Sequence, residues 1–212
     1  VLIKIGVSAD QATILFFLIG LIGALLFMSV SPILTLLGYV LWRLHIIIDM
    51  CDGDIARFNS SFSIRGAYWD AVIHSVLNPL YNILICVSFY VQFDNNLFLF
   101  LSSFLGMSSS LLLSVKNNYY KAMLHNNIPY NRSSVEKKLV MTGLSKIKYK
   151  ITYILSEILS IEGFLLLSVV VRFVGIESYA LNLILLFMVF NCAIACVKFY
   201  SLSYKGKTFT KA

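Results

Sequence analysis

The sequence predicts an all-α integral membrane bundle of six transmembrane helices, and composition and hydropathy are the observations behind that prediction. Of the 212 residues, 59% are hydrophobic and 13% are charged, whereas a soluble domain carries about 25% charged residues. The mean hydropathy is +0.84. The chain holds three prolines, and this scarcity suits long helices because proline interrupts them. Composition therefore places the chain in the membrane class.

Six apolar segments are long enough to cross a bilayer, which takes about 20 helical residues. The first is expected at residues 13–28, with Ser8 and Asp10 as candidate N-caps because short polar side chains accept the free N–H groups of a helix start. The other five are expected at residues 32–58, 66–92, 97–120, 147–173 and 178–203. No internal repeat divides the chain, so residues 1–212 are predicted to form one membrane-embedded domain.

Positive charge is concentrated in alternate connections between the expected helices. The turns at residues 28–32 and 94–96 carry no lysine or arginine, whereas Lys4, Arg57 and Arg65 flank the opposite helix ends. Because positively charged loops stay in the cytoplasm, both termini are predicted to be cytoplasmic. The same rule accounts for the net charge of +7, so no nucleic-acid partner is expected. The chain is predicted to be a multi-pass protein, of the inner or plasma membrane if it is bacterial.

Four ionisable side chains gather where the second expected helix ends and the third begins: Asp49, Asp52, Asp70 and His74. At about 100° per residue, Asp49 and Asp52 lie within about 60° of each other on one helix. Asp70 and His74 are spaced i, i+4 and share a face of the next helix. The connection at residues 58–65 is short, so the two helices are expected to be antiparallel neighbours whose acidic faces meet.

These carboxylates predict a divalent metal site on the cytoplasmic side of the membrane. Unpaired carboxylates are costly there without a counter-ion, and oxygen ligands suit Mg²⁺, Mn²⁺ or Ca²⁺. Gly53, Ala56 and Gly66 would leave room for a bulky ligand, and Arg57 offers a planar group for phosphate. The alternative is a buried charge network in which Arg57 and Arg65 neutralise two aspartates, but that network does not explain the small residues.

Other polar side chains also fall inside the expected helices. His45 lies one turn before Asp49, and it either orients a carboxylate or is simply hydrogen-bonded in the bundle. Arg172 is near the end of the fifth expected helix, and its side chain is expected to extend to the membrane interface. Glu157 and Glu162 either receive a cationic head group or pair with a lysine of the bundle.

The charged and small residues together resemble the signature of the CDP-alcohol phosphatidyltransferases, D-x2-D-G-x2-A-R-x8-G-x3-D-x3-D. Seven of its eight fixed positions match at the right spacing: Asp49, Asp52, Gly53, Ala56, Arg57, Gly66 and Asp70. The eighth position, an aspartate in the family, is His74 in this chain. Residues 8–13 are also similar to a degraded form of the family's S-P-N-x-x-T opening.

The resemblance implies six membrane helices, a homodimer and a defined reaction. Family enzymes transfer a substituted phosphate from a CDP-linked alcohol to an acceptor hydroxyl and release CMP. Two divalent cations, Mg²⁺ or Mn²⁺, would act on the diphosphate. By similarity, the metal ligands would be Asp49, Asp52, Asp70 and His74, and the nucleotide-binding residues would be Gly53, Ala56, Arg57 and Gly66.

His74 occupies the position of the family's candidate general base and second-metal ligand. Neutral imidazole can accept a proton and can bind metal, so His74 is expected to be the catalytic base as well as a ligand. With one negative charge fewer than in the family, the second ion is expected to bind more weakly or to be a softer ion such as Mn²⁺. The alternatives from other classes are a catalytically impaired scaffold subunit with the same fold and a small transporter.

Two substrate classes remain open because the family motif does not separate them. CDP-diacylglycerol with a small polar alcohol would make a phospholipid, and this commoner role of the family is the one expected here. A small CDP-alcohol, such as CDP-choline, CDP-ethanolamine or a phosphonate analogue, would instead modify a lipid or glycan acceptor. Because the chain begins with Val1 and some relatives carry a soluble nucleotidyltransferase domain before the membrane part, we also hypothesise that it is cut from a longer chain.

Overall fold

The structure, a computed structural model, describes residues 6–59, 64–125 and 161–208. Those residues are helical throughout apart from short turns, and no strand occurs among them. The elements are α1 (Ala9–Phe27), α2 (Pro32–Phe58), α3 (Ile64–Phe93), α4 (Asn96–His125), α6 (Ile161–Val174), the short 3₁₀ helix η3 (Glu177–Tyr179) and α7 (Ala180–Thr208). The all-α class predicted from the sequence is confirmed.

Four described helices are long and apolar enough to cross a membrane, by length and composition. They are α1, α2, α3 over Arg65–Phe93, and α7 over Ala180–Ser203. The described residues of α4 include a further apolar stretch, Asn96–Leu111. Large apolar side chains such as Ile33 and Val189, exposed by 71% and 62%, cover the outer surface, as lipid contact requires. The predicted start of the fifth helix at residue 147, together with Glu157, lies outside the described residues.

Local sequence signals explain where the first two helices begin. Ser8 caps α1: its hydroxyl accepts from the Gln11 N–H at 3.2 Å, and the Gln11 side chain accepts from the Ser8 N–H at 2.9 Å. This reciprocal pair satisfies two N–H groups that the helix leaves free. The second helix starts at Pro32, where a missing N–H does no harm and the fixed φ suits the first turn. Of the two candidate N-caps, Ser8 and Asp10, it is therefore Ser8 that caps α1.

The first helix packs against both helices of the motif. Close approach of α1 and α2 depends on Gly23 and Gly38, because a Cβ on Gly38 would lie 2.9 Å from the Gly23 carbonyl oxygen. The first helix also packs on α3, because the positions of Gly20 and Gly23 face residues of both α2 and α3. The helices α2 and α3 approach each other less closely than either approaches α1. The expectation that α2 and α3 are direct neighbours is therefore only partly right, since their side chains meet over α1.

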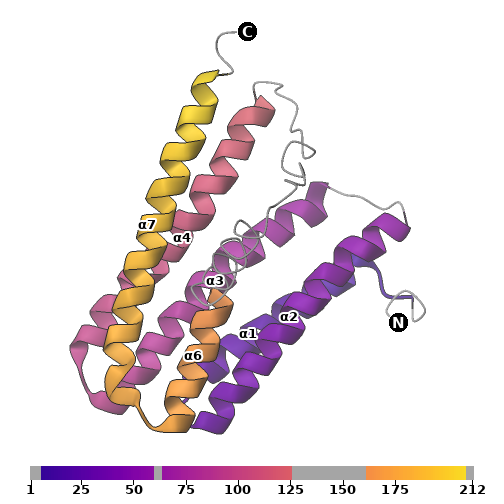
Figure 1. Ribbon diagram of the computed structural model, residues 1–212. Coiled ribbons are helices and arrows are strands. Elements are labelled where there is room, and N and C mark those ends of the chain that lie inside the picture. The colour runs from indigo at the N-terminus through magenta and orange to yellow at the C-terminus, as the bar shows by residue number, and fades with distance from the viewer. Residues whose placement is uncertain (1–5, 60–63, 126–160, 209–212) are drawn as a thin grey trace, which may run out of the picture.

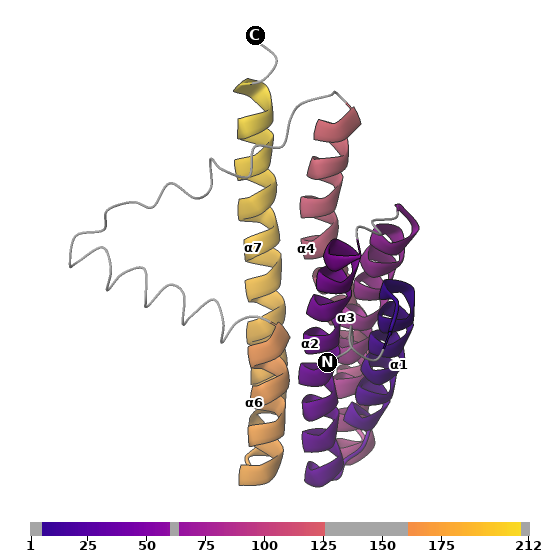
Figure 2. The same cartoon turned by 90° about the vertical axis from the view of Figure 1, so that its right-hand side faces the viewer.

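The remaining helices complete the bundle beside α2 and α3. In order of contact, α3 packs on α4, α4 packs on α7, and α6 contacts α2 and α7 (Figures 1 and 2). Stacking of the Phe164 and Phe187 rings, with centroids 4.2 Å apart, joins α6 to α7. A second tie is the ion pair between Arg43 of α2 and Glu162 of α6. Within the described residues, Glu162 is therefore paired with an arginine.

The two ends of the bundle differ in charge. Figure 1 shows the turns that follow α1, α3 and α6 together at one end, and these are the turns that carry little positive charge. The motif lies toward the opposite end, where α1 and α3 begin and α2 ends. At the low-charge end Arg172 is buried, with 3% exposure. The expectation that it extends to the interface is wrong, because partners inside the bundle hold its guanidinium.

Candidate metal site

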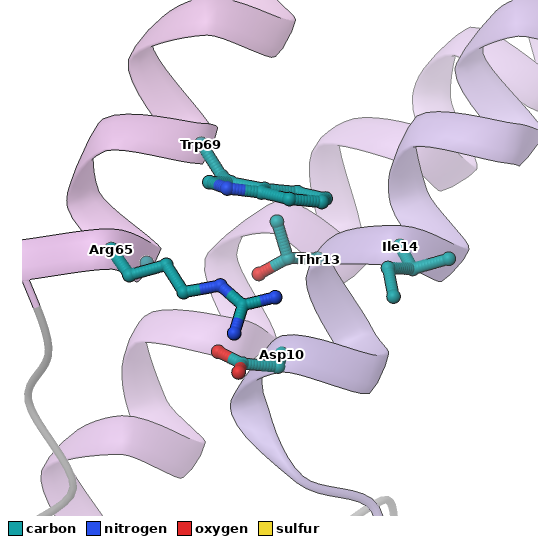
Figure 3. Close-up of a pocket in the computed structure, with 6 residues that line it drawn as sticks. Asp10, Thr13, Ile14, Arg65 and Trp69 are labelled. Carbon is teal, nitrogen blue, oxygen red and sulfur yellow. The ribbon is translucent and has the colours of Figure 1, made fainter.

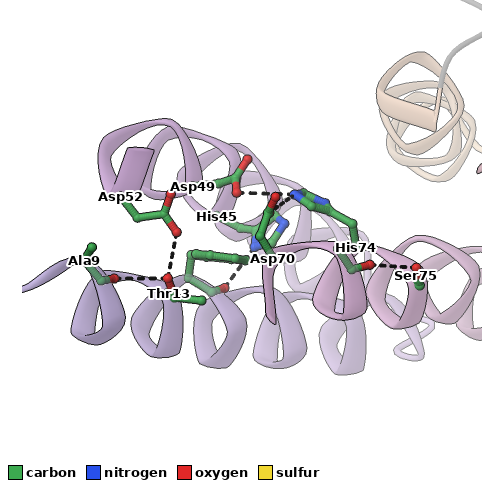
Figure 4. A network of polar contacts seen from close by, with 10 residues as sticks. Ala9, Thr13, His45, Asp49, Asp52, Asp70, His74 and Ser75 are labelled. Atoms are coloured by element: carbon green, nitrogen blue, oxygen red, sulfur yellow. Dashed lines mark hydrogen bonds and ion pairs between the residues drawn. The ribbon is translucent and has the colours of Figure 1, made fainter. Parts of the chain in front are cut away.

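Three of the predicted ligands, one from α2 and two from α3, converge above α1. The ligand atoms of Asp49, Asp70 and His74 all lie within 4.8 Å of one another. His74 Nε2 lies 3.3 Å from Asp49 Oδ1 and 3.2 Å from Asp70 Oδ1, so one nitrogen faces both carboxylates (Figure 4). All three side chains are partly buried. This arrangement of two carboxylates and one imidazole suits one divalent ion.

The first helix forms the floor of this group. The Phe16 ring of α1 stacks with the His74 ring, with centroids 6.1 Å apart. It also meets the His45 ring edge-on at 5.1 Å. Phe16 is fully buried, so α1 closes the lower side of the group to water. The group is thus shielded from water on the side of α1.

The fourth predicted ligand, Asp52, lies apart from the other three. The Thr13 hydroxyl of α1 is 2.8 Å from Asp52 Oδ2 and 3.0 Å from the Ala9 carbonyl oxygen. A hydroxyl has one proton, so Thr13 donates to one of these acceptors at a time. When the Thr13 hydroxyl donates to Asp52, it ties one oxygen of that carboxylate to α1. The described geometry therefore brings together a three-residue set for one ion, with Asp52 beside it.

Two of the predicted nucleotide-binding residues are adjacent on α2. A Cβ on Gly53 would lie 3.5 Å from the guanidinium nitrogens of Arg57, so Arg57 covers the Gly53 face. Arg57 also donates to Asp54 at 2.5 Å, and both of these side chains are largely exposed. Ala56 is partly buried on the same helix. The pairing of Arg57 with Asp54 argues against the network in which Arg57 neutralises an aspartate of the motif.

The third small residue, Gly66 of α3, lines a separate cavity between α1 and α3. The cavity volume is about 20 Å³, which is room for about one water molecule. Figure 3 shows the Arg65 side chain reaching between Trp69 and Asp10, and its guanidinium carbon lies 5.4 Å from the Trp69 ring centroid. Arg65 therefore meets this cavity and not the carboxylates of Asp49 and Asp70. The full lining is Asp10, Thr13, Ile14, Arg65, Gly66 and Trp69.

Among the candidate functional residues, His45 has the surroundings that were least predictable from the sequence. Its side chain is fully buried, and Nδ1 lies 2.9 Å from the Phe16 carbonyl oxygen. The expectation that it is hydrogen-bonded within the bundle is confirmed. Its partner is a backbone group, for which the sequence carries no signal. Thr13, by contrast, could have been found, because it closes the opening motif at residues 8–13.

Comparison with known proteins adds no family assignment. No protein-family model matches the chain, and no curated protein is significantly similar to it. The resemblance to the CDP-alcohol phosphatidyltransferases therefore rests on the motif residues and their spacing.

Proposed function

We propose that the chain is a membrane-embedded, metal-dependent CDP-alcohol phosphotransferase. The observation that carries the proposal is the convergence of Asp49, Asp70 and His74 from two helices, at the spacing of the family signature. Ionisable side chains within apolar helices are costly and are usually functional. An ion held by these residues would stabilise negative charge on a bound diphosphate. The second ion that the family uses would require Asp52, which lies beside this group.

The protein residues would divide the reaction between them. Gly53 and Arg57 would bind the nucleotide end of the donor, because Arg57 carries an exposed guanidinium suited to phosphate. The acceptor oxygen bonds to the phosphorus distal to cytidine, the bond to the CMP oxygen breaks, and CMP leaves with that electron pair. The hydroxyl proton goes to His74, the proposed base. In the arrangement described, His74 Nε2 faces two carboxylates, so its roles as base and as ligand compete for one nitrogen.

The proposed setting is a homodimer with six spans and cytoplasmic termini. Hydropathy supports the span count, and the positive charge near the motif supports the orientation. A site near the cytoplasmic surface lets a lipid substrate enter from the bilayer while a polar one enters from water. CDP-diacylglycerol is the proposed donor, with a small polar alcohol as acceptor; a small CDP-alcohol with a lipid or glycan acceptor is the second candidate.

Release of CMP is the test of this function. The purified full chain in lipid vesicles would be given CDP-diacylglycerol with inositol, glycerol or serine, or CDP-ethanolamine with diacylglycerol, each with Mg²⁺ or Mn²⁺. The proposal predicts CMP with at least one pair, and none from an Asp70→Asn variant. Absence of CMP from every pair, while the wild-type protein still binds metal, would favour the scaffold subunit.

A further inference from the structure

We infer that Phe16 of α1 is a positioning residue for His74, and that by stacking on the imidazole it keeps His74 Nε2 directed at Asp49 and Asp70. The inference rests on the proposed function in taking His74 as a metal ligand of the site. It adds a residue that lies outside both the family signature and its opening motif. His45, which holds Phe16 in turn, is the second part of the arrangement.

The orientation of the His74 ring decides what its Nε2 can reach. This nitrogen lies 3.3 Å from Asp49 Oδ1 and 3.2 Å from Asp70 Oδ1, so rotation of the ring would remove it from both carboxylates. A histidine that binds metal is almost always held by a hydrogen bond from its other ring nitrogen. Within the described ranges, the printed sequence places no such partner on His74 Nδ1, and its side-chain contacts to carboxylates are made by Nε2. Because an ion would occupy Nε2, the ring needs another contact to hold its plane.

Aromatic contacts supply that support. The Phe16 and His74 rings have centroids 6.1 Å apart and planes 24° apart, within the range of about 4.5–7 Å for aromatic pairs. The His45 ring meets His74 from another direction, with centroids 5.8 Å apart and planes at 69°. A ring face and a ring edge therefore restrict the rotation of His74 from two sides.

Phe16 is itself held by both its ring and its backbone. Its side chain is fully buried, and its ring meets the His45 ring at 5.1 Å and 61°. The Phe16 carbonyl oxygen lies 2.9 Å from His45 Nδ1. Because a carbonyl only accepts, His45 Nδ1 carries the proton and donates it to the backbone of α1. His45 thus fixes residue 16 at two points.

Both motif helices determine where this part of α1 lies. Tyr81 of α3 donates to the Gly20 carbonyl oxygen at 2.8 Å, one turn after the Phe16 carbonyl that His45 of α2 contacts. A Cβ on Gly20 would lie 2.8 Å from His45 Nδ1, so the close approach of the two helices here requires glycine. The position of Phe16 beside His74 is therefore set by α2 and α3 together.

The competing explanation is that Phe16 is only a core side chain, whose loss lowers stability and leaves the site unchanged in the folded protein. Phe27 is the matched control, because it belongs to the same helix, is also 0% exposed and packs on the Tyr81 ring at 5.5 Å. It lies eleven residues further along α1, roughly 16 Å at 1.5 Å per residue. Phe27→Leu therefore disturbs packing without removing a contact of His74.

Pulsed electron paramagnetic resonance of Mn²⁺ bound to the full chain detects the histidine nitrogen directly. We expect the coupling of one histidine nitrogen in the wild type and in Phe27→Leu, a weakened or absent coupling in Phe16→Leu, and none in His74→Gln. The Mn²⁺ affinity of Phe16→Leu should fall about 10- to 100-fold, as it does when a residue that supports a ligand is removed. A Phe16→Leu coupling identical to that of the wild type would overturn the inference, and so would the absence of the coupling from the wild type.

A double variant tests whether Phe16 acts through His74. If it does, adding Phe16→Leu to His74→Gln lowers the Mn²⁺ affinity no further, because two residues that act through one contact are not additive. Losses that add would contradict the positioning role. The wild-type chain with Mg²⁺ provides a test that needs no variant: nuclear Overhauser contacts between the ring protons of Phe16 and His74 are expected, and their absence would overturn the stack.

CMP release by the same samples separates the positioning role from the phosphotransferase. Loss of the nitrogen coupling in Phe16→Leu, together with no CMP release by the wild type from any donor, would support the positioning role and contradict the phosphotransferase. CMP release by the wild type, together with an unchanged coupling in Phe16→Leu, would do the reverse.

Discussion

The bundle holds a buried polar cluster toward each end, and the two differ in how completely their atoms are paired. At the low-charge end, Arg172 donates to the Val30 carbonyl at 3.0 Å, to Gln92 Oε1 at 3.2 Å and to Ser88 Oγ at 2.5 Å. Its guanidinium also lies over the Phe89 ring, 4.5 Å from the centroid. This cluster ties α6 to α3 and to the turn after α1.

The cluster at the motif end is not closed in this way. His45 Nε2 and Asp70 Oδ1 are buried without a hydrogen bond of ordinary geometry among the described residues, although Asp70 Oδ1 lies 3.2 Å from His74 Nε2. A fully paired polar cluster stabilises the fold, whereas a cluster with incompletely paired acceptors has capacity for a further partner. The comparison teaches that buried charge alone does not identify a functional site, because Arg172 is buried and fully engaged by structural partners.

The largest effect is expected at the motif end, on activity. His74→Ala should lower CMP release by about 10²- to 10⁴-fold if His74 is the base. Ser75→Ala is the matched control, because Ser75 is the exposed neighbour whose hydroxyl donates to the Ala71 carbonyl at 2.7 Å. Initial rates of CMP release at saturating Mn²⁺ measure the effect, and equal rates for His74→Ala and wild type would exclude His74 as the base.

The next effect is expected at the low-charge end, on stability. Arg172→Leu removes a donor from Ser88, Gln92 and the Val30 carbonyl, and each buried polar group left unsatisfied costs about 1–3 kcal/mol. The measurement is the free energy of unfolding in detergent. Arg57→Leu removes an arginine whose pair is exposed, so it should cost about 1 kcal/mol or less. Similar losses for both variants would contradict the comparison.

Smaller effects are expected from alanine substitutions at two glycines of α2, one with a packing role and one with a proposed role in ligand binding. Gly38→Ala pushes a Cβ against the Gly23 carbonyl oxygen, and such overpacking costs about 1–3 kcal/mol. Gly53→Ala meets only the Arg57 guanidinium at an ordinary 3.5 Å, so stability should hold while the KM for the CDP donor rises. Unfolding and donor kinetics measure the two effects, and an unchanged KM would remove Gly53 from the nucleotide site.

The smallest effect is expected at the contact between α1 and Asp52. Thr13→Val removes the hydroxyl near Asp52 Oδ2, which is worth about 1 kcal/mol, and CMP release should fall a few-fold. Thr13→Ser keeps the hydroxyl and should behave as the wild type. If the serine and valine variants are equally active, the hydroxyl does not position Asp52.

Much of the helix pattern could be predicted from the sequence, because apolar runs and breakers are local features. The second helix was predicted with the bounds it has, Pro32–Phe58, and the facing of Asp49 toward Asp70 and His74 followed from helical spacing. The position of α1 over both motif helices could not be predicted, since it depends on packing at Gly20 and Gly23.

The burial of Arg172 could not be predicted from the sequence either. Its partners come from a helix about 80 residues away and from a turn about 140 residues away along the chain, and no local pattern links them. The separation of Asp52 from the other ligands has the same kind of cause, because Thr13 of α1 approaches it from a distant segment.

A calorimetric titration of the purified full chain with Mn²⁺ tests the central claim most directly. The account predicts saturable binding by the wild type and by Asp54→Asn, which alters an exposed carboxylate outside the group, and loss of binding in Asp70→Asn. Binding that survives Asp70→Asn unchanged, or its absence from the wild type, would contradict the assignment of Asp49, Asp70 and His74 as a metal site.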